Sequence, residues 1–139
     1  MRMLLAVLAL CLSNLAIAQA TTMKIRLIID GKVISGTLVD NATTRDLVSL
    51  LPMTVTLEDY AATEKITYLS RKLSTAGAPP GSEPDVGSIA YYAPWGNIAF
   101  FYKDAPYARG LIPLGRIDTG IEGLRSPGSL KARIEKDSP

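Results

Sequence analysis

The chain has 139 residues, of which 15 are basic, 13 are acidic and none is histidine. Its one cysteine is Cys11, so the chain lacks the soft ligands of a zinc site and the base of a Ser-His-Asp or Cys-His nucleophile. Charges of neither sign cluster, which gives no reason to expect nucleic acid or an anionic membrane as a partner. We predict no metal and no cofactor.

Residues 1–20 have the three parts of a secretory signal peptide. Arg2 supplies the early positive charge, residues 4–12 are nearly all apolar, and Ala18-Gln19-Ala20 places small residues ahead of a cleavage point. We therefore predict cleavage after Ala20 and a periplasmic or secreted protein. The mature part, residues 21–139, is predicted to be one domain without a membrane partner.

Two other interpretations of this leader are less favourable. A transmembrane helix needs about 20 apolar residues, and Ser13, Asn14 and Gln19 interrupt the run. A lipoprotein needs a small residue before the modified cysteine, and Leu10 precedes Cys11. Cleavage would leave 14 basic and 13 acidic residues and no cysteine, so the core would form without a disulfide.

The first predicted elements are two strands joined by a tight turn. Residues 23–29 alternate between apolar and polar side chains for most of their length, Asp30-Gly31 follows, and residues 32–39 resume a strand-like pattern. Asp-Gly between two such runs is a strong hairpin signal, because both turn positions favour positive φ. Gly36 inside the second strand predicts a bulge or a tight bend.

A short helix is predicted next. Asn41 or Thr43 can cap its start, Thr43 and Asp46 have the spacing of a capping box, and Pro52 follows its end. Its apolar face would consist of Leu47, Leu50 and Leu51. Asn41-Ala42-Thr43 also matches a glycosylation acceptor, but the helix cap is the better interpretation.

The rest of the chain again reads as strands. They are predicted at residues 53–58, 64–70, 87–92, 97–103, 111–117 and 130–135. Residues 74–86 consist largely of turn formers and predict one long exposed loop. Eight short strands with one or two short helices favour a mainly β fold in which the sheet closes into a barrel and so has no exposed edges.

Two segments, residues 87–102 (GSIAYYAPWGNIAFFY) and 110–117 (GLIPLGRI), resemble the bacterial cyclophilin-like barrel family. The resemblance extends over most of residues 23–135 and includes Asp30-Gly31 and Glu64-Lys65-Ile66. It implies the cyclophilin fold, a closed eight-stranded barrel capped by short helices, which agrees with the strand count.

The resemblance also bears on catalysis. When the pattern of true prolyl isomerases is placed on this sequence, their pocket phenylalanine falls on Phe101, their glutamine on Ala99 and their histidine on Leu111. The nearest candidate for their essential arginine is Arg71. One apolar wall is kept and two polar groups are replaced, so we assign no catalytic residue. We predict a module that binds a small molecule or an extended peptide; a peptidyl-prolyl isomerase of low activity is the alternative.

The ligand site is predicted on the outer wall, because side chains fill the interior of an eight-stranded barrel. It would lie beside the loop of residues 74–86 and form an aromatic floor with one cationic wall. Such a site would favour an apolar ligand with a carbonyl or carboxylate group. The predicted ligand-binding residues are Arg71, Tyr68, Tyr91, Tyr92 and Phe101.

Several of these side chains also have purely structural interpretations. On the strand over residues 97–103, Phe100 and Tyr102 share one face and Phe101 takes the other, so any of them can be a core residue. Trp95 lies in a predicted turn, where it would either plug the end of the barrel or present an aromatic ring to a ligand.

Overall fold

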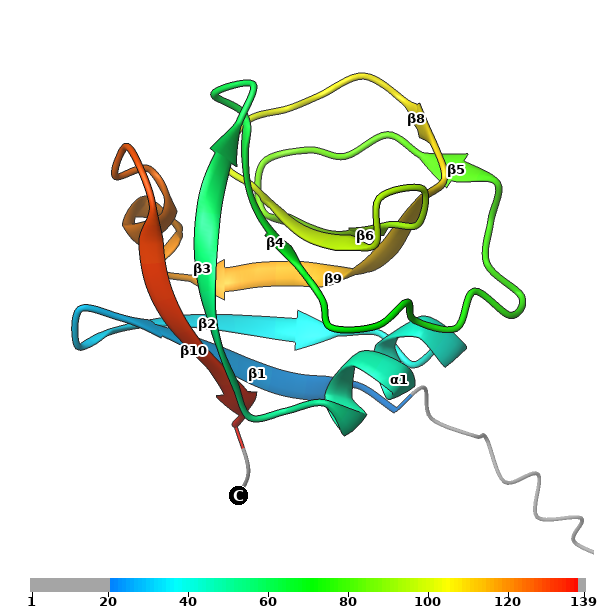
Figure 1. Ribbon diagram of the computed structural model, residues 1–139, viewed down its shortest axis with the longest axis horizontal. Coiled ribbons are helices and arrows are strands. Elements are labelled where there is room, and N and C mark those ends of the chain that lie inside the picture. Colours follow the sequence, from blue (N-terminus) through cyan, green and yellow to red (C-terminus); the bar gives the residue numbers. More distant parts are fainter. Residues whose placement is uncertain (1–20, 138–139) are drawn as a thin grey trace, which may run out of the picture.

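The computed structural model describes residues 21–137, so the predicted signal peptide and its cleavage site lie outside the described residues. The described chain forms a closed antiparallel barrel with the strand order β1-β10-β3-β4-β7-β6-β9-β2 (Figure 1). The predicted eight-stranded barrel is confirmed. Its strands are β1 (Met23–Ile29), β2 (Lys32–Leu38), β3 (Met53–Tyr60), β4 (Glu64–Tyr68), β6 (Ser88–Tyr92), β7 (Asn97–Phe101), β9 (Leu111–Thr119) and β10 (Leu130–Lys136).

The β1–β2 hairpin has the predicted turn. Asp30 and Gly31 take φ values of 50° and 74°, the left-handed conformation that a two-residue hairpin needs at both central positions. The pairing of β2 with β9 shifts register between Ser35 and Gly36, which is the predicted irregularity. A Cβ atom at Gly36 would lie 3.1 Å from Ile89 Cδ1 and 3.2 Å from the Arg116 carbonyl oxygen, so the glycine allows β2 and β9 to approach closely.

Helix α1 (Ala42–Ser49) begins at Asn41, one of the two predicted caps. The Thr44 amide donates to Asn41 Oδ1 at 2.8 Å, and the Asn41 amide donates to Thr44 Oγ1 at 2.9 Å. The capping box therefore pairs Asn41 with Thr44, and the predicted pairing of Thr43 with Asp46 is wrong. Thr43 instead donates its hydroxyl to the Ser74 carbonyl at 2.6 Å, because it faces the loop that follows β4.

The main core lies inside the barrel and is closed at both ends. Leu47 of α1 is buried at one end, and Leu124 of the 3-10 helix η1 (Ile121–Leu124) is buried at the other. Figure 1 shows these two elements at opposite ends of the barrel. No helix within residues 21–137 is long and apolar enough to cross a membrane.

A second, smaller sheet lies outside the barrel. β5 (Gly81–Ser82) pairs with β8 (Ala108–Arg109), and the two run side by side over the outer wall (Figure 1). The sequence predicted only an exposed loop over residues 74–86, so β5 is a correction. Backbone bonds continue this contact: the Gly110 amide donates to the Pro80 carbonyl at 2.8 Å, and the Ala105 amide donates to the Pro84 carbonyl at 3.3 Å.

Candidate functional site

The two faces of β7 separate the core from the outer wall. Ile98 and Phe100 point into the main core, and Tyr102 joins them just beyond the end of the strand. Ala99 and Phe101 belong to a separate apolar cluster. This confirms the predicted alternation and shows that Phe101 does not pack in the barrel interior. The outer-wall cluster consists of Ile66, Ala90, Ala99, Phe101 and Leu111, all of which are buried.

Small-ligand sites usually have volumes of about 300–1,000 Å³. The hollow over this cluster has a volume of about 320 Å³, at the lower end of that range. Phe101 and Leu111 form part of its lining and are almost completely buried. They come from β7 and β9, two strands that both flank β6. The cavity floor therefore rests on the rigid strands of the barrel.

One wall of the cavity is the turn between β3 and β4. Ala61 and Ala62 take φ values of 51° and 50°, and the Thr63 amide donates to the Tyr60 carbonyl at 3.0 Å. This tight turn places Tyr60 and Glu64, the last residue of β3 and the first of β4, in the lining of the same cavity. Residue pairing across the hairpin brings these two residues opposite each other.

The next wall is aromatic and comes from the turn between β6 and β7. The amides of Trp95 and Gly96 both donate to the Tyr92 carbonyl, at 3.2 and 2.9 Å. The Trp95 ring packs edge-on against Tyr60 and against Tyr92, with ring centroids 5.3 Å apart in both pairs. Trp95 is 46 % exposed, so it joins two hairpins at the rim of the cavity and does not plug the barrel.

The covering segment between β7 and β9 supplies the remaining wall. Its lining residues are Ala105, Pro106, Tyr107 and Ala108, with Pro84 from the opposite loop. The Tyr107 ring packs over Gly81, where an added Cβ would lie 2.6 Å from the phenol oxygen. The pairing of β5 with β8 therefore fixes the position of Tyr107.

Glu64 gives the cavity its charge. It is half-buried, and burial raises the pKa of its carboxyl group from 4.5 to about 7. No hydrogen bond or ion pair with the described residues opposes this shift. Among the described residues that line the cavity, no other has an acidic or basic side chain apart from the tyrosine phenols.

The structure brings together two of the five predicted ligand-binding residues. Tyr92 and Phe101 both line the cavity. Tyr91 instead points into the main core, where its phenol oxygen accepts a hydrogen bond from the Leu73 amide at 3.1 Å. Tyr68 is exposed and lines a different hollow, next to Leu50.

Arg71, the predicted cationic wall, also lies elsewhere. Its guanidinium donates to both carboxylate oxygens of Asp46 in α1, at 2.6 and 3.0 Å. This hydrogen-bonded pair lowers the pKa of Asp46 to about 2. Asp46 also accepts from the Ser74 amide at 2.7 Å, so the arginine helps to fasten the loop after β4 to the helix. The structure thus separates Arg71 from Tyr92 and Phe101.

Sequence reasoning missed most of the cavity wall. Trp95 was expected either to plug the end of the barrel or to meet a ligand, and neither Tyr60 nor Tyr107 was among the predicted ligand-binding residues. Glu64 alternates with the buried Lys65 on β4, so its face was open to prediction once the strand was assigned. Tyr107 gave no such signal, because it lies in a covering segment whose path depends on the pairing of β5 with β8.

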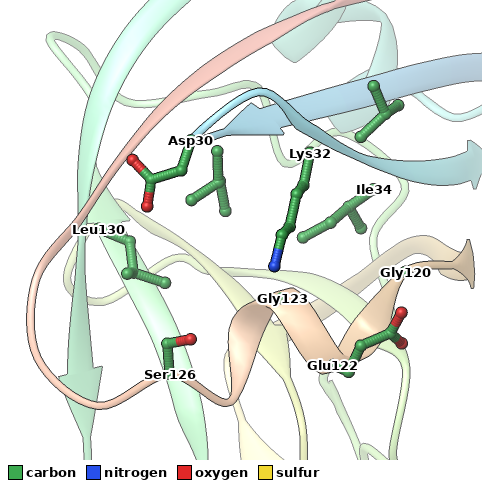
Figure 2. Close-up of a pocket in the computed structure, with 10 residues that line it drawn as sticks. Asp30, Lys32, Ile34, Gly120, Glu122, Gly123, Ser126 and Leu130 are labelled. Atoms are coloured by element: carbon green, nitrogen blue, oxygen red, sulfur yellow. The ribbon is translucent and has the colours of Figure 1, made fainter.

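A second hollow, of about 350 Å³, lies at the end of the barrel near η1. Figure 2 shows Lys32 reaching toward the helical turn that carries Glu122, with Asp30 on the other side. These three charged residues are exposed and of both signs. Such a polar hollow at a hairpin tip is ordinarily solvated surface, so the aromatic cavity is the better candidate for a ligand site.

Comparisons with known proteins support the fold. The family model described as "Cyclophilin-like family" matches residues 27–135. The solution structure of the hypothetical protein AF2241 from Archaeoglobus fulgidus is similar to this chain, with a TM-score of 0.66 and 18 % sequence identity. The match covers 86 % of this chain and 98 % of the archaeal chain. No curated protein matches the chain significantly.

Proposed function

The chain belongs to the cyclophilin-like family, and from this premise we propose that it is an exported binding module that takes a small molecule or an extended peptide in the aromatic cavity. The export part of the proposal depends on residues 1–20 alone. The binding part depends on the cavity between the β3–β4 turn, the β6–β7 turn and the covering segment. The two parts are tested separately.

One observation carries the binding proposal: three large aromatic side chains remain exposed around an apolar floor. Tyr60, Trp95 and Tyr107 are 44 %, 46 % and 57 % exposed, and all three line the same cavity. Exposing several apolar side chains to water at one concave place costs free energy unless a ligand covers them. Such patches therefore often mark binding sites. Rings that combine apolar faces with polar tips are also common ligand contacts.

The shape of the neighbouring surface supports a peptide as one class of ligand. A third hollow, of about 210 Å³, borders Pro84 and includes Glu83 and Arg116. Pro84 belongs to the lining of this hollow and of the aromatic cavity. An extended segment that crossed Pro84 would place one side chain in each hollow, whereas a small molecule would occupy the aromatic cavity alone.

The lining gives less support to prolyl isomerisation. Ala99 and Leu111 stand at the positions where the resemblance to true prolyl isomerases implies glutamine and histidine. Arg71 is bound to Asp46 at the helix. The described residues that line the cavity include no arginine. A bound prolyl carbonyl would therefore meet an apolar floor without a cationic donor, which favours binding without catalysis.

The binding proposal is tested by native mass spectrometry of the protein purified from its own compartment. We expect a retained ligand mass that is lost in Tyr107→Ala, because this variant removes a cavity wall. Tyr68→Ala is the matched control, since Tyr68 is equally exposed but lines a different hollow. Loss of the ligand in Tyr68→Ala or Arg71→Ala, with retention in Tyr107→Ala, would move the site to the originally predicted place beside the loop of residues 74–86.

The export proposal has its own measurement. Cleavage after Ala20 predicts a mature chain that begins at Thr21 and is recovered outside the cytoplasm. Intact-mass analysis of the recovered protein gives the position of its first residue. A retained leader, or the mass of a lipid on Cys11, would contradict the proposal.

A further inference from the structure

The charge inside the aromatic cavity narrows the class of ligand. We propose that the cavity binds an organic ammonium ion, with the cationic group beside the Glu64 carboxylate and its apolar part against Phe101 and Leu111. This inference rests on the binding function proposed above. It replaces the carbonyl or carboxylate ligand expected from the sequence, because the expected cation, Arg71, is held by Asp46.

The first support is the unpaired state of Glu64. Its carboxyl group is half-buried and has no hydrogen bond or ion pair to the described residues. Burial therefore removes part of the water around this charge, and no described protein group takes the place of that water. The nearby Asp59 and Lys65 do not compensate, because they pair with each other at 2.9 Å and Lys65 is fully buried. A cationic ligand would supply the missing partner, whereas an anionic one would add a like charge.

The second support is the aromatic wall itself. The face of an aromatic ring is negative and attracts cations, most strongly for tryptophan. Tyr60, Tyr92, Trp95 and Tyr107 line the cavity together with one carboxyl group. This lining suits an alkylammonium ion. The carboxylate would compensate its positive charge, and the aromatic rings would contact the carbon atoms bound to its nitrogen.

The other charged groups near the cavity do not change this conclusion. The covering segment includes Lys103, Asp104 and Arg109, which are exposed and do not line the cavity. Asp104 accepts from the Val86 amide at 2.9 Å, which directs it toward the neighbouring loop. The titratable groups that do line the cavity besides Glu64 are tyrosine phenols.

The proposal also predicts a dependence on pH. The pKa of Glu64 is about 7, so the carboxyl group is mostly neutral at pH 5 and mostly ionised at pH 8. A bound cation attracts the ionised form, so affinity should rise as pH increases across this interval. A neutral ligand should bind equally well at both values or slightly better at pH 5.

The experiment uses Trp95, the single tryptophan of the chain, as a fluorescent reporter at the cavity rim. Three probes of similar size are titrated at pH 8 and pH 5: benzyltrimethylammonium, benzyl alcohol and benzoate. We expect benzyltrimethylammonium to bind at pH 8 with a Kd at least tenfold lower than the other two, and this advantage to shrink at pH 5. Glu64→Gln should abolish the advantage. Glu83→Gln, an exposed carboxylate in the third hollow, should preserve it.

The outcomes separate the two proposals. If no probe gives a saturable change in Trp95 fluorescence, the ammonium proposal is wrong, and the binding function is then decided by the comparison of Tyr107→Ala with Tyr68→Ala in native mass spectrometry. If benzyl alcohol or benzoate binds as tightly as benzyltrimethylammonium, the ammonium proposal is wrong while the binding function stands. The probe series and the pH series use the unaltered protein, and thermal unfolding of Glu64→Gln shows whether that variant is folded.

Discussion

Lys65 is a charged side chain that the barrel buries completely. Its ammonium group donates to the carbonyls of Ser126 and Gly128 at 2.7 Å each and pairs with Asp59 at 2.9 Å. Through these contacts a residue of β4 holds the loop between η1 and β10. A buried cation with three partners is a structural device, and it fixes where the neighbouring Glu64 points by taking the opposite face of the strand.

We expect Lys65→Ala to lower the free energy of unfolding by about 2–4 kcal/mol, because it removes charged hydrogen bonds and leaves a cavity. Lys131→Ala is the control: Lys131 is an exposed lysine of β10, and surface changes of this kind usually stay within about 0.5 kcal/mol. Denaturant unfolding measures both. A loss below about 1 kcal/mol for Lys65→Ala would show that the ammonium contacts contribute little.

Glu64 should also make stability depend on pH. Its pKa is about 7 in the folded protein, above the usual 4.5, so the folded state binds this proton more tightly than the unfolded chain. Stability should therefore fall as pH rises from about 4.5 to 7. No histidine titrates in this window, and the carboxyl groups with lowered pKa values, such as Asp46 and Glu135, act at lower pH.

The measurement is the free energy of unfolding in denaturant at several pH values between 5 and 7.5. The unaltered protein should become less stable across the series, and Glu64→Gln should show a flatter profile. A profile that is the same in both proteins would mean that the carboxyl group is hydrated more than its burial suggests.

For single residues, the sequence predicted the aromatic character of the site better than it predicted where each side chain lies. Phe101 lies on the outer wall as expected, because alternation along a strand assigns it to the face opposite Phe100 and Tyr102. Tyr91 and Tyr92 are consecutive on β6, so only one of them can face the outer wall, and Tyr91 faces the core. The position of Arg71 depends on a segment distant in sequence. Tyr91 meets Leu73 across the end of the barrel, and Arg71 meets Asp46 of α1.

Among the elements, the short pair β5 and β8 matters most for the site, because it holds one wall of the cavity. A Cβ atom at Gly81 would lie 2.4 Å from the Ala108 carbonyl oxygen and 2.6 Å from the Tyr107 phenol oxygen. The pair is too short to keep its place if its backbones are forced apart. Gly81 is therefore required by the close approach of β5 to the segment that carries Tyr107 and Ala108.

We predict that Gly81→Ala separates β5 from β8 and frees Tyr107, at a cost of about 1–3 kcal/mol. Hydrogen exchange of the Gly110 amide, which bonds to the Pro80 carbonyl, should become faster while the amides of the barrel strands remain protected. Gly123→Ala is the control, since its added Cβ would approach only the side chain of Ile34, at 3.1 Å, and no backbone of another segment. If the amides of the barrel strands in Gly81→Ala also exchange faster, the covering segment does not open independently of the barrel, and the prediction is wrong.

The length of each strand explains whether the sequence predicted it. The eight barrel strands have five or more residues each, long enough for apolar alternation or turn signals to appear. β5 and β8 have two residues each and no alternation. They arise because Ala105 and Ala108 pack on the outer apolar cluster and backbone hydrogen bonds join the covering segment to Pro80 and Pro84, which is a tertiary effect.

For the molecule as a whole, the cyclophilin-like fold leads to a prediction about catalysis. The resemblance places Ala99 and Leu111 where true isomerases have polar groups, and Arg71 lies elsewhere. We expect little acceleration of Xaa-Pro isomerisation in short peptides, with kcat/KM below the roughly 10⁴ M⁻¹s⁻¹ at which typical enzymes begin. A protease-coupled assay measures this against the same peptide without protein. A value within the enzymatic range would favour the low-activity isomerase.

The closure of the barrel has a consequence for how the chain folds. Its two ends meet in the sheet: β1 pairs with β10, and Arg26 bonds to Glu135, 109 positions along the chain (Figure 1). Bringing such distant residues together requires a large loss of chain entropy before any contact between them forms. Chains dominated by distant pairings fold slowly, in about milliseconds to seconds. The ring of strands should therefore close late, and until it does, both β1 and β10 keep an open edge that another chain can join.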